Sequence, residues 1–157
     1  MKIGVFVYSQ TGNTLSVAEK LCEKLKADGQ NATLERITIV GDPKGDVKKV
    51  AFDRRPLPDG YDAVIFAGQV HAFHLSAPMA AYLSGIGSLE GKKTACFVTQ
   101  SSAAWLGGNR AIKKMIQLIG EKGGGASGSG IINWSNKKRG EQIDGLVARL
   151  GGIFQNM

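Results

Sequence analysis

The sequence predicts a doubly wound α/β domain with a parallel β-sheet, and three observations support this prediction. Short apolar runs alternate with amphipathic stretches along the whole chain. The apolar runs show little alternation of apolar and polar residues, as expected of strands buried on both faces of a parallel sheet. A polar loop follows the first apolar run and leads directly into a helical pattern. Right-handed crossovers then place helices on both faces of the sheet.

The N-terminal part of the chain contains a strand, a helix and a second strand. The apolar run within Lys2–Tyr8 predicts the first strand. The helix is predicted at about Gly12–Asp28, because Leu15, Ala18, Cys22 and Leu25 recur at helical spacing. The second strand is predicted at about Ala32–Ile39.

The segment between Gly41 and Gly60 does not continue this alternation. It contains three prolines and a basic cluster, namely Pro43, Pro56, Pro58, Lys48, Lys49, Arg54 and Arg55. Within it, Asp46–Phe52 is the stretch that we expect to form a turn or a short element. We therefore predict a long loop, and loops of this length are uncommon unless they are functional or mobile.

The rest of the chain returns to strands and helices. Strands are predicted at Ala63–Ala67, Thr94–Thr99 and about Gly128–Trp134, where short apolar runs occur. Helices are predicted at about Ala77–Leu83, Asn109–Lys122 and Gly140–Leu150. Pro78 falls in the first turn of its helix, where a missing N–H group does no harm. The last two helices carry apolar residues at helical spacing.

Length and composition are those of one globular domain that covers residues 1–157. Apolar residues make up 43% of the chain, and no apolar run approaches the roughly 20 residues that a membrane span needs. The sequence enters a strand directly after Met1, so we expect no signal peptide and a cytoplasmic location. Cys22 and Cys96 fall on different predicted elements and are expected to be reduced core residues.

The loop Ser9–Thr14, with the sequence Ser-Gln-Thr-Gly-Asn-Thr, is the most informative stretch of the chain. Backbone N–H groups at a helix N-terminus converge on one point, where the helix dipole favours an anion. Hydroxyl groups and the Asn13 amide add donors, and Gly12 lets the backbone approach a ligand closely. Since the loop has no Lys or Arg, neutral donors would hold a phosphate. The alternative is a polar turn with an ordinary helix cap.

Other phosphate-binding motifs are absent from this loop. A nucleoside-triphosphate loop requires a Lys near its end, and the loop has none. A dinucleotide fingerprint requires three spaced glycines, of which Gly12 is the one present. A phospho-acceptor receiver domain, another use of this architecture, needs acidic residues after the first strand. Tyr8-Ser9-Gln10 supplies none.

Ligands of open α/β sheets bind beyond the carboxyl ends of the strands, where the strand order reverses. Three loops are predicted to meet there: Ser9–Thr14, Gly68–His74 and Gln100–Gly108. The second loop contributes His71 and Phe73, and the third contributes Trp105. Aromatic faces of this kind stack on a flat ring. His74 is expected to lie at the surface.

The first loop resembles the phosphate loop of the flavodoxin family, whose pattern is Ser/Thr-x-Thr-Gly-Asn-Thr after the first strand. The stretch from Gly68 to Pro78 is similar to the family's second loop and the Ser-Pro-led helix after it, with Gln69 and His71 in place of Pro and Trp. Trp105–Arg110 and Ile132–Asn136 are also similar to a branch of flavodoxin-like proteins. The resemblance covers nearly the whole chain. It implies a three-layer sandwich with five parallel strands in the order 2-1-3-4-5.

The resemblance also implies FMN as the cofactor and one-electron transfer between redox partners as the function. No catalytic acid or base and no metal site are expected. The cofactor-binding residues that it implies are Ser9, Gln10, Thr11, Gly12, Asn13, Thr14, Gly68, Gln69, Val70, His71, Ala72, Phe73, Thr99, Gln100, Ser101, Trp105 and Gly108. The Gly68 carbonyl is the candidate partner of the flavin N5–H group, because glycine permits the peptide rotation that this family uses.

The chain departs from the family at three points. His71 stacks less strongly than Trp and can form a hydrogen bond with the flavin. The usual helix between the second and third strands has no counterpart in the sequence. The net charge is +7, whereas small flavodoxins are typically acidic.

The positive charge favours a redox partner with an acidic docking face, or an anionic small molecule. Nucleic acid and membrane partners are not expected, because the basic residues are scattered and form no recognised motif. The main alternative is an NAD(P)H-dependent FMN oxidoreductase that reduces quinones or other small acceptors. Small residues at Ala103, Ala104, Gly107 and Gly108 would leave room for a nicotinamide, and Arg110 would meet a phosphate. The sequence leaves the oligomeric state open.

Overall fold

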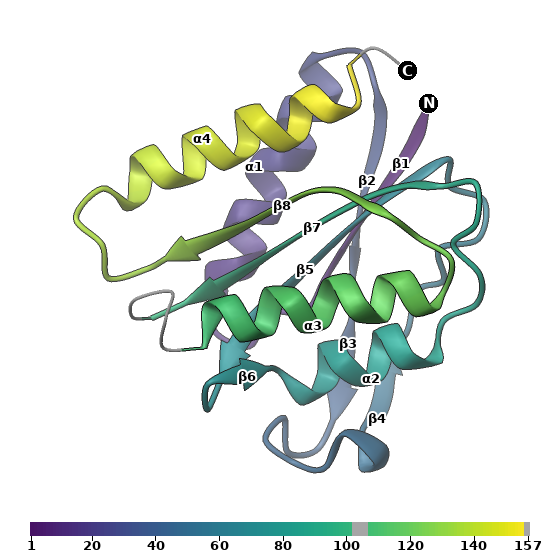
Figure 1. The fold of residues 1–157 in the computed structure, drawn as a ribbon, viewed down its shortest axis with the longest axis vertical. Helices are drawn as coiled ribbons and strands as arrows, with labels where there is room; N and C mark the ends of the chain where they lie inside the picture. Colours follow the sequence, from purple (N-terminus) through teal and green to yellow (C-terminus); the bar gives the residue numbers. More distant parts are fainter. Residues whose placement is uncertain (102–106, 156–157) are drawn as a thin grey trace.

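The central sheet is parallel and has the predicted strand order. A computed structural model describes residues 1–101 and 107–155. The main path of the sheet is β2-β1-β5-β7-β8, which confirms the order expected for a flavodoxin-like sandwich. These strands are β1 (Lys2–Val7), β2 (Asn31–Arg36), β5 (Ala63–His71), β7 (Lys93–Gln100) and β8 (Ala126–Asn133). Figure 1 shows their fanned arrangement, with β1 and β2 beside the N-terminus.

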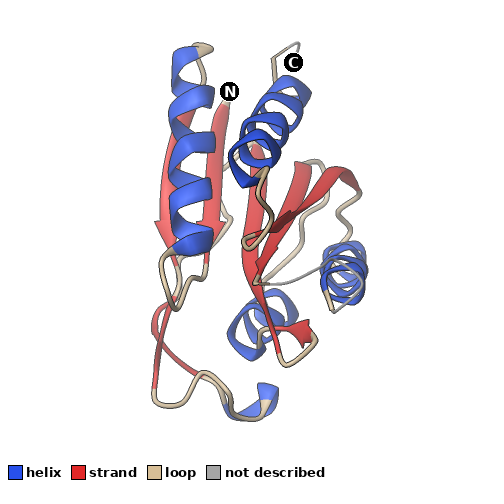
Figure 2. Cartoon of the chain, turned by 90° about the vertical axis from the view of Figure 1, so that its left-hand side faces the viewer, coloured by secondary structure: helices blue, strands red, loops and turns tan. Residues whose placement is uncertain are grey.

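Helices cover both faces of this sheet. Helices α1 (Asn13–Ala27) and α4 (Arg139–Ile153) pack on one face, and α2 (Ala77–Gly85) and α3 (Gly108–Glu121) pack on the other (Figure 2). The side chains of Ile3, Val5 and Val7 point to the α1 face, while Phe6 points to the α2 face. Alternation along β1 therefore fills two separate apolar cores, as expected of a strand buried on both sides. No helix in the described ranges is long and apolar enough to span a membrane.

The segment after β2 corrects the sequence prediction. The strand expected at Ala32–Ile39 breaks at Ile37, which is buried and donates its N–H to the Val7 carbonyl. The chain then leaves the sheet as β3 (Thr38–Val40), forms the short 3₁₀ helix η1 (Val47–Lys49) and returns as β4 (Ala51–Arg54). The loop predicted for 41–60 is therefore in part an antiparallel hairpin with β3. The short element expected within Asp46–Phe52 is η1 together with the start of β4.

An aromatic contact anchors this hairpin. The Phe52 ring meets the fully buried Tyr82 ring of α2 edge to face, with 6.3 Å between centroids. The Tyr82 hydroxyl donates to the Pro56 carbonyl at 2.5 Å, and the Arg55 guanidinium lies 5.5 Å from the Phe52 ring centroid. Phe52 thus packs against the apolar core on the α2 face of the sheet.

Tyr82→Phe tests this anchor. Loss of the hydrogen bond to Pro56 is expected to lower the free energy of unfolding at pH 7 by about 1 kcal/mol. Burial raises the pKa of Tyr82 above its ordinary value of 10.0, so the folded protein keeps this proton at a pH where the unfolded chain loses it. Stability from this group is present below about pH 10 and falls as the pH rises further. Urea denaturation at pH 7 and pH 11 should show a smaller alkaline loss in Tyr82→Phe, and an equal loss would contradict the assignment.

Candidate functional site

The N-terminus of α1 is arranged to hold an anion. Gly12 precedes the helix with φ +95°, a left-handed conformation that glycine adopts without strain. Its N–H donates to Ser9 Oγ at 3.0 Å, and its carbonyl accepts the first helical bond, from Ser16 N–H, at 3.0 Å. Four backbone N–H groups have no acceptor among the described residues, and they are those of Thr11, Asn13, Thr14 and Leu15.

No acidic side chain of α1 itself lies beside these amides. The first turn of α1 has no acidic residue. Tyr8 follows the last residue of β1 just before the loop, and burial raises the pKa of its phenol, which therefore stays neutral. Free amides, the positive end of the helix dipole and no neighbouring carboxylate are the chemical requirements of a phosphate site.

A buried hydrogen bond joins this helix to β7. Thr14 Oγ1 and Thr99 Oγ1 lie 2.7 Å apart, and both side chains are buried. The Thr14 hydroxyl, expected from the sequence to face a ligand, is therefore engaged with Thr99. The Thr14 backbone N–H remains available. This bond holds the start of α1 against the end of β7.

The second predicted loop is in large part a strand, which corrects the sequence expectation. β5 continues through His71, and β6 (His74–Leu75) pairs back on it, with His71 opposite His74. The loop expected from Gly68 to His74 is therefore a two-residue hairpin turn at Ala72 and Phe73. Pairing with β6 was invisible in the sequence because β6 has only two residues.

Gln69 ties this hairpin to the first loop. The Gln10 N–H donates to Gln69 Oε1 at 3.1 Å, and Gln69 Nε2 donates to Gln10 Oε1 at 3.3 Å. A proline at position 69, as in the family pattern, would lack this side-chain amide. The substitution that looked like a departure in the sequence thus connects two of the predicted site loops.

The hairpin turn is strained. Ala72 has φ +49° and Phe73 has φ +68°, values that a two-residue hairpin of type I′ requires and that Asn and Gly usually supply. Phe73 is 58% exposed at the tip. Gly107 packs directly against it, because a Cβ at Gly107 would come 2.6 Å from the Phe73 Cα. The N-terminus of α3 therefore meets the hairpin through backbone contact.

Gly68 has a packing role in this structure. It is buried within β5, opposite Val98 of β7, and a Cβ there would lie 3.0 Å from Met79 Cγ of α2. Its place inside the strand ladder disfavours the peptide rotation that the resemblance implies for it. The Val70 side chain likewise packs against the apolar core.

The third predicted loop is described at its two ends. Thr99 and Gln100 are buried at the end of β7, Ser101 is exposed, and Gly108 begins α3. A Cβ at Gly108 would come 2.6 Å from Gln100 Oε1, so glycine allows the helix to start against this side chain. Trp105 and the small residues Ala103 and Ala104 lie outside the described residues.

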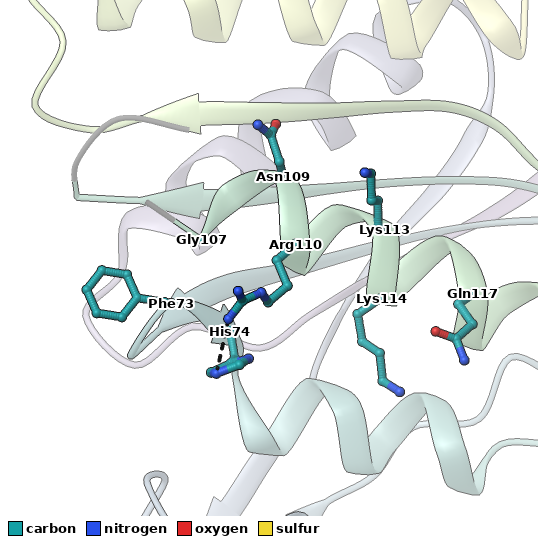
Figure 3. Close-up of a pocket in the computed structure, with 8 residues that line it drawn as sticks. All are labelled: Phe73, His74, Gly107, Asn109, Arg110, Lys113, Lys114 and Gln117. Carbon is teal, nitrogen blue, oxygen red and sulfur yellow. Dashed lines mark hydrogen bonds between the residues drawn. The ribbon is translucent and has the colours of Figure 1, made fainter. Parts of the chain in front are cut away.

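A basic groove runs beside the hairpin along α3. Its volume is about 780 Å³, and its lining residues are Phe73, His74, Gly107, Asn109, Arg110, Lys113, Lys114 and Gln117 (Figure 3). Arg110 Nη1 points at His74 Nε2, 3.5 Å away. Sequence reasoning had singled out Arg110 but missed the two lysines. Their spacing of three and four residues from Arg110 on a predicted helix was the available signal.

Comparison with known proteins agrees with this architecture. The family model described as flavodoxin matches residues 5–144. Flavodoxin 2 from Bacillus cereus superposes with a TM-score of 0.70 at 19% identity, over 98% of this chain and 100% of that one. A flavodoxin from Streptococcus pneumonia TIGR4 gives 0.68 at 16% identity, over 98% and 99% of the two chains.

A third solved structure was determined with its cofactor. A flavoprotein in complex with FMN from Lactobacillus acidophilus NCFM gives a TM-score of 0.62 at 14% identity, over 90% of this chain and 97% of that one. A comparison with curated proteins found no match. Since the family match spans most of the sequence, the chain belongs to the flavodoxin family. At the level of the family, this supports an FMN-binding carrier of electrons.

The residues present fit a phosphate monoester such as that of FMN. The free amides at the start of α1 are donors only, and they face no carboxylate of the first turn. A neutral donor set of this kind accepts a dianion without competing side-chain charges. The fit rests on backbone geometry, which Gly12 makes possible.

The strain at the hairpin tip gives a testable consequence. Replacing Ala72 and Phe73 by Asn and Gly supplies the residues that a type I′ turn favours, so the free energy of unfolding should rise by about 1 kcal/mol or more. Urea denaturation measures the change. Phe73→Ala is the matched control, because it removes the exposed ring but keeps a non-glycine residue at φ +68°. An equal gain in this control would show that the ring, and not the backbone, is the source of the effect.

Proposed function

We propose that this protein binds FMN at the carboxyl edge of its sheet and carries electrons between redox partners, as a single domain over residues 1–157. The observation that carries the proposal is the set of free amides at the N-terminus of α1, next to a hairpin with an exposed aromatic tip. When bound, FMN would supply the one-electron redox chemistry, and the protein would supply binding, orientation and electrostatics.

The first loop would hold the phosphate. The backbone N–H groups of Thr11, Asn13 and Thr14 are available as donors, and the Thr11 side chain is exposed. The Ser9 hydroxyl accepts from Gly12 N–H, which leaves its own proton to donate outward. Gln10 would fix the loop through Gln69. The helix dipole would add stabilisation of the negative charge.

The hairpin and the start of the third loop would flank the ring. His71 and Phe73 are the aromatic candidates, and Ala72 lies between them at the tip. Ser101 and Trp105 remain candidates from the third loop. Other predicted site residues would support the site by packing at the carboxyl edge of the sheet, and they are Gly68, Val70, Thr99, Gln100 and Gly108. Electron transfer of this kind requires no catalytic acid or base.

Asn13→Asp separates phosphate binding from helix stability. The change is nearly isosteric and adds a carboxylate to a first turn that has none. The protein without cofactor should gain about 0.3–1 kcal/mol of stability from the helix dipole. FMN binding should weaken by roughly 2–4 kcal/mol, because two negative charges then approach within a few ångströms. Urea denaturation and quenching of FMN fluorescence measure the two effects.

Riboflavin, which lacks the phosphate, is the control ligand. Its affinity for Asn13→Asp should equal its affinity for the unmodified protein. If Asn13→Asp binds FMN as well as the unmodified chain does, the phosphate does not sit at α1. If the unmodified protein takes up no FMN, the proposed function fails as a whole.

The alternative function is an NAD(P)H-dependent FMN oxidoreductase, and one observation favours it. Arg110 lines an open groove directly beside the hairpin, where a nucleotide phosphate would find a cation. The FMN-loaded protein should be mixed with NADPH and then NADH under anaerobic conditions while flavin absorption is followed. An electron carrier should show no rapid bleaching with either nucleotide but should be reduced by dithionite. Rapid bleaching would establish the oxidoreductase.

A further inference from the structure

Three cations on the N-terminal half of α3 form no ion pair with any acidic group of residues 1–101 and 107–155. Arg110, Lys113 and Lys114 are exposed and line the groove beside Phe73. The ion pairs found among the described residues are Lys24–Asp28 and Arg54–Glu35, far from this groove in the sequence and on other elements. The neighbouring helix α2 has no charged residue. The positive charge of the groove is therefore not neutralised locally.

This arrangement is unfavourable for the helix itself. Cations near a helix N-terminus oppose the helix dipole, and like charges three or four residues apart repel each other. Helix α3 has no acidic residue in its first turn and no basic residue in its last turn, which reverses the favourable order. Arg110 and Lys114 also point to the same side of the helix (Figure 3). The dipole and the side chains thus add to one local positive potential.

An exposed aromatic residue adjoins these charges. Phe73 is 58% exposed, and a strained turn holds it at the end of the groove. A small apolar centre with a charged border is the usual composition of a protein–protein interface. Transient electron-transfer complexes bury little area, so one aromatic residue and a few charges are a sufficient contact.

The groove is poorly suited to a small molecule as its main ligand. Small-molecule sites enclose most of the ligand among apolar side chains. This groove is lined instead mainly by exposed polar side chains, including Asn109, Lys113, Lys114 and Gln117, and none of its described lining residues is a buried charged group. Long flexible lysines at an open surface act mainly on the approach of a charged macromolecule.

We propose that this basic groove, formed by Arg110, Lys113 and Lys114 beside Phe73, docks an acidic redox protein next to the cofactor edge. The proposal rests on the proposed FMN site, because it places the partner against the hairpin that would flank the flavin. It also gives a role to three of the basic residues that make up the net charge of +7. Acidic side chains of the partner pair with the cations. Phe73, at the tip of the β5–β6 hairpin, contacts the partner beside the proposed flavin site.

The test compares two charge-reversal variants that lower the net charge equally. K113E/K114E alters the groove, and K20E/K26E alters exposed lysines of α1 on the opposite face of the sheet. Both are loaded with FMN and mixed in a stopped-flow instrument with a dithionite-reduced acidic [2Fe–2S] ferredoxin. At low ionic strength, K113E/K114E should lower the second-order rate constant about tenfold or more, and K20E/K26E less than threefold. The difference should vanish near 1 M salt, where charges are screened within about 3 Å.

A second measurement does not depend on the cofactor. Fluorescein-labelled poly-L-glutamate should bind the unmodified protein and K20E/K26E, with binding to K113E/K114E reduced about tenfold by anisotropy. Failure to take up FMN would defeat the proposed function, while this measurement would still decide the docking surface. Equal losses in both variants would overturn the proposal in favour of net charge alone. The proposal would also be overturned, and a nucleotide site identified, if K113E/K114E abolished binding of 2′,5′-ADP but left the rate of electron transfer from reduced ferredoxin unchanged.

Discussion

Burial of a parallel sheet on both faces is the constraint on which this structure depends. The strands β1, β5 and β7 are buried along most of their length, so each face of the sheet needs a cover. Four helices supply most of it, and Phe52 of the β3–β4 hairpin packs against the core through Tyr82. Because the covered strands run in one direction, their connections emerge together at the carboxyl edge. The candidate site is a consequence of this burial.

Three short-range contacts then connect the loops and helices that follow separate strands at this edge. Gln10 and Gln69 join the first loop to the hairpin, and Thr14 and Thr99 join α1 to β7. Gly107 brings α3 against the hairpin by backbone contact. Each contact links elements that are far apart in the sequence, which explains why the edge can hold one ligand although it is built from several connections.

Two of the helix N-termini at this edge, those of α1 and α3, differ in their electrostatics. Helix α1 begins with free amides and no acidic residue in its first turn, which suits an anion held by backbone donors. Helix α3 begins with Arg110 and two lysines, which extend a positive field into solvent. A bound phosphate and an approaching acidic protein would thus both be attracted by the positive end of a helix, the phosphate by backbone amides of α1 and the protein by exposed side chains of α3. Arg110, Lys113 and Lys114 thus lie where an approaching acidic partner would meet them.

The sequence by itself determined the five strands of the main sheet, the four α-helices and the polar loop before α1, because apolar periodicity and turn residues are local properties. The order of those strands followed from the resemblance of its motifs to those of flavodoxins. Tertiary structure decided the rest. The β3–β4 hairpin exists through the contact of Phe52 with Tyr82, and β5 extends to His71 because β6 pairs with it. The Gln10–Gln69 pair and the basic groove likewise require elements distant in sequence to meet. Such contacts follow from how helices and strands pack, and no pattern of neighbouring residues encodes them.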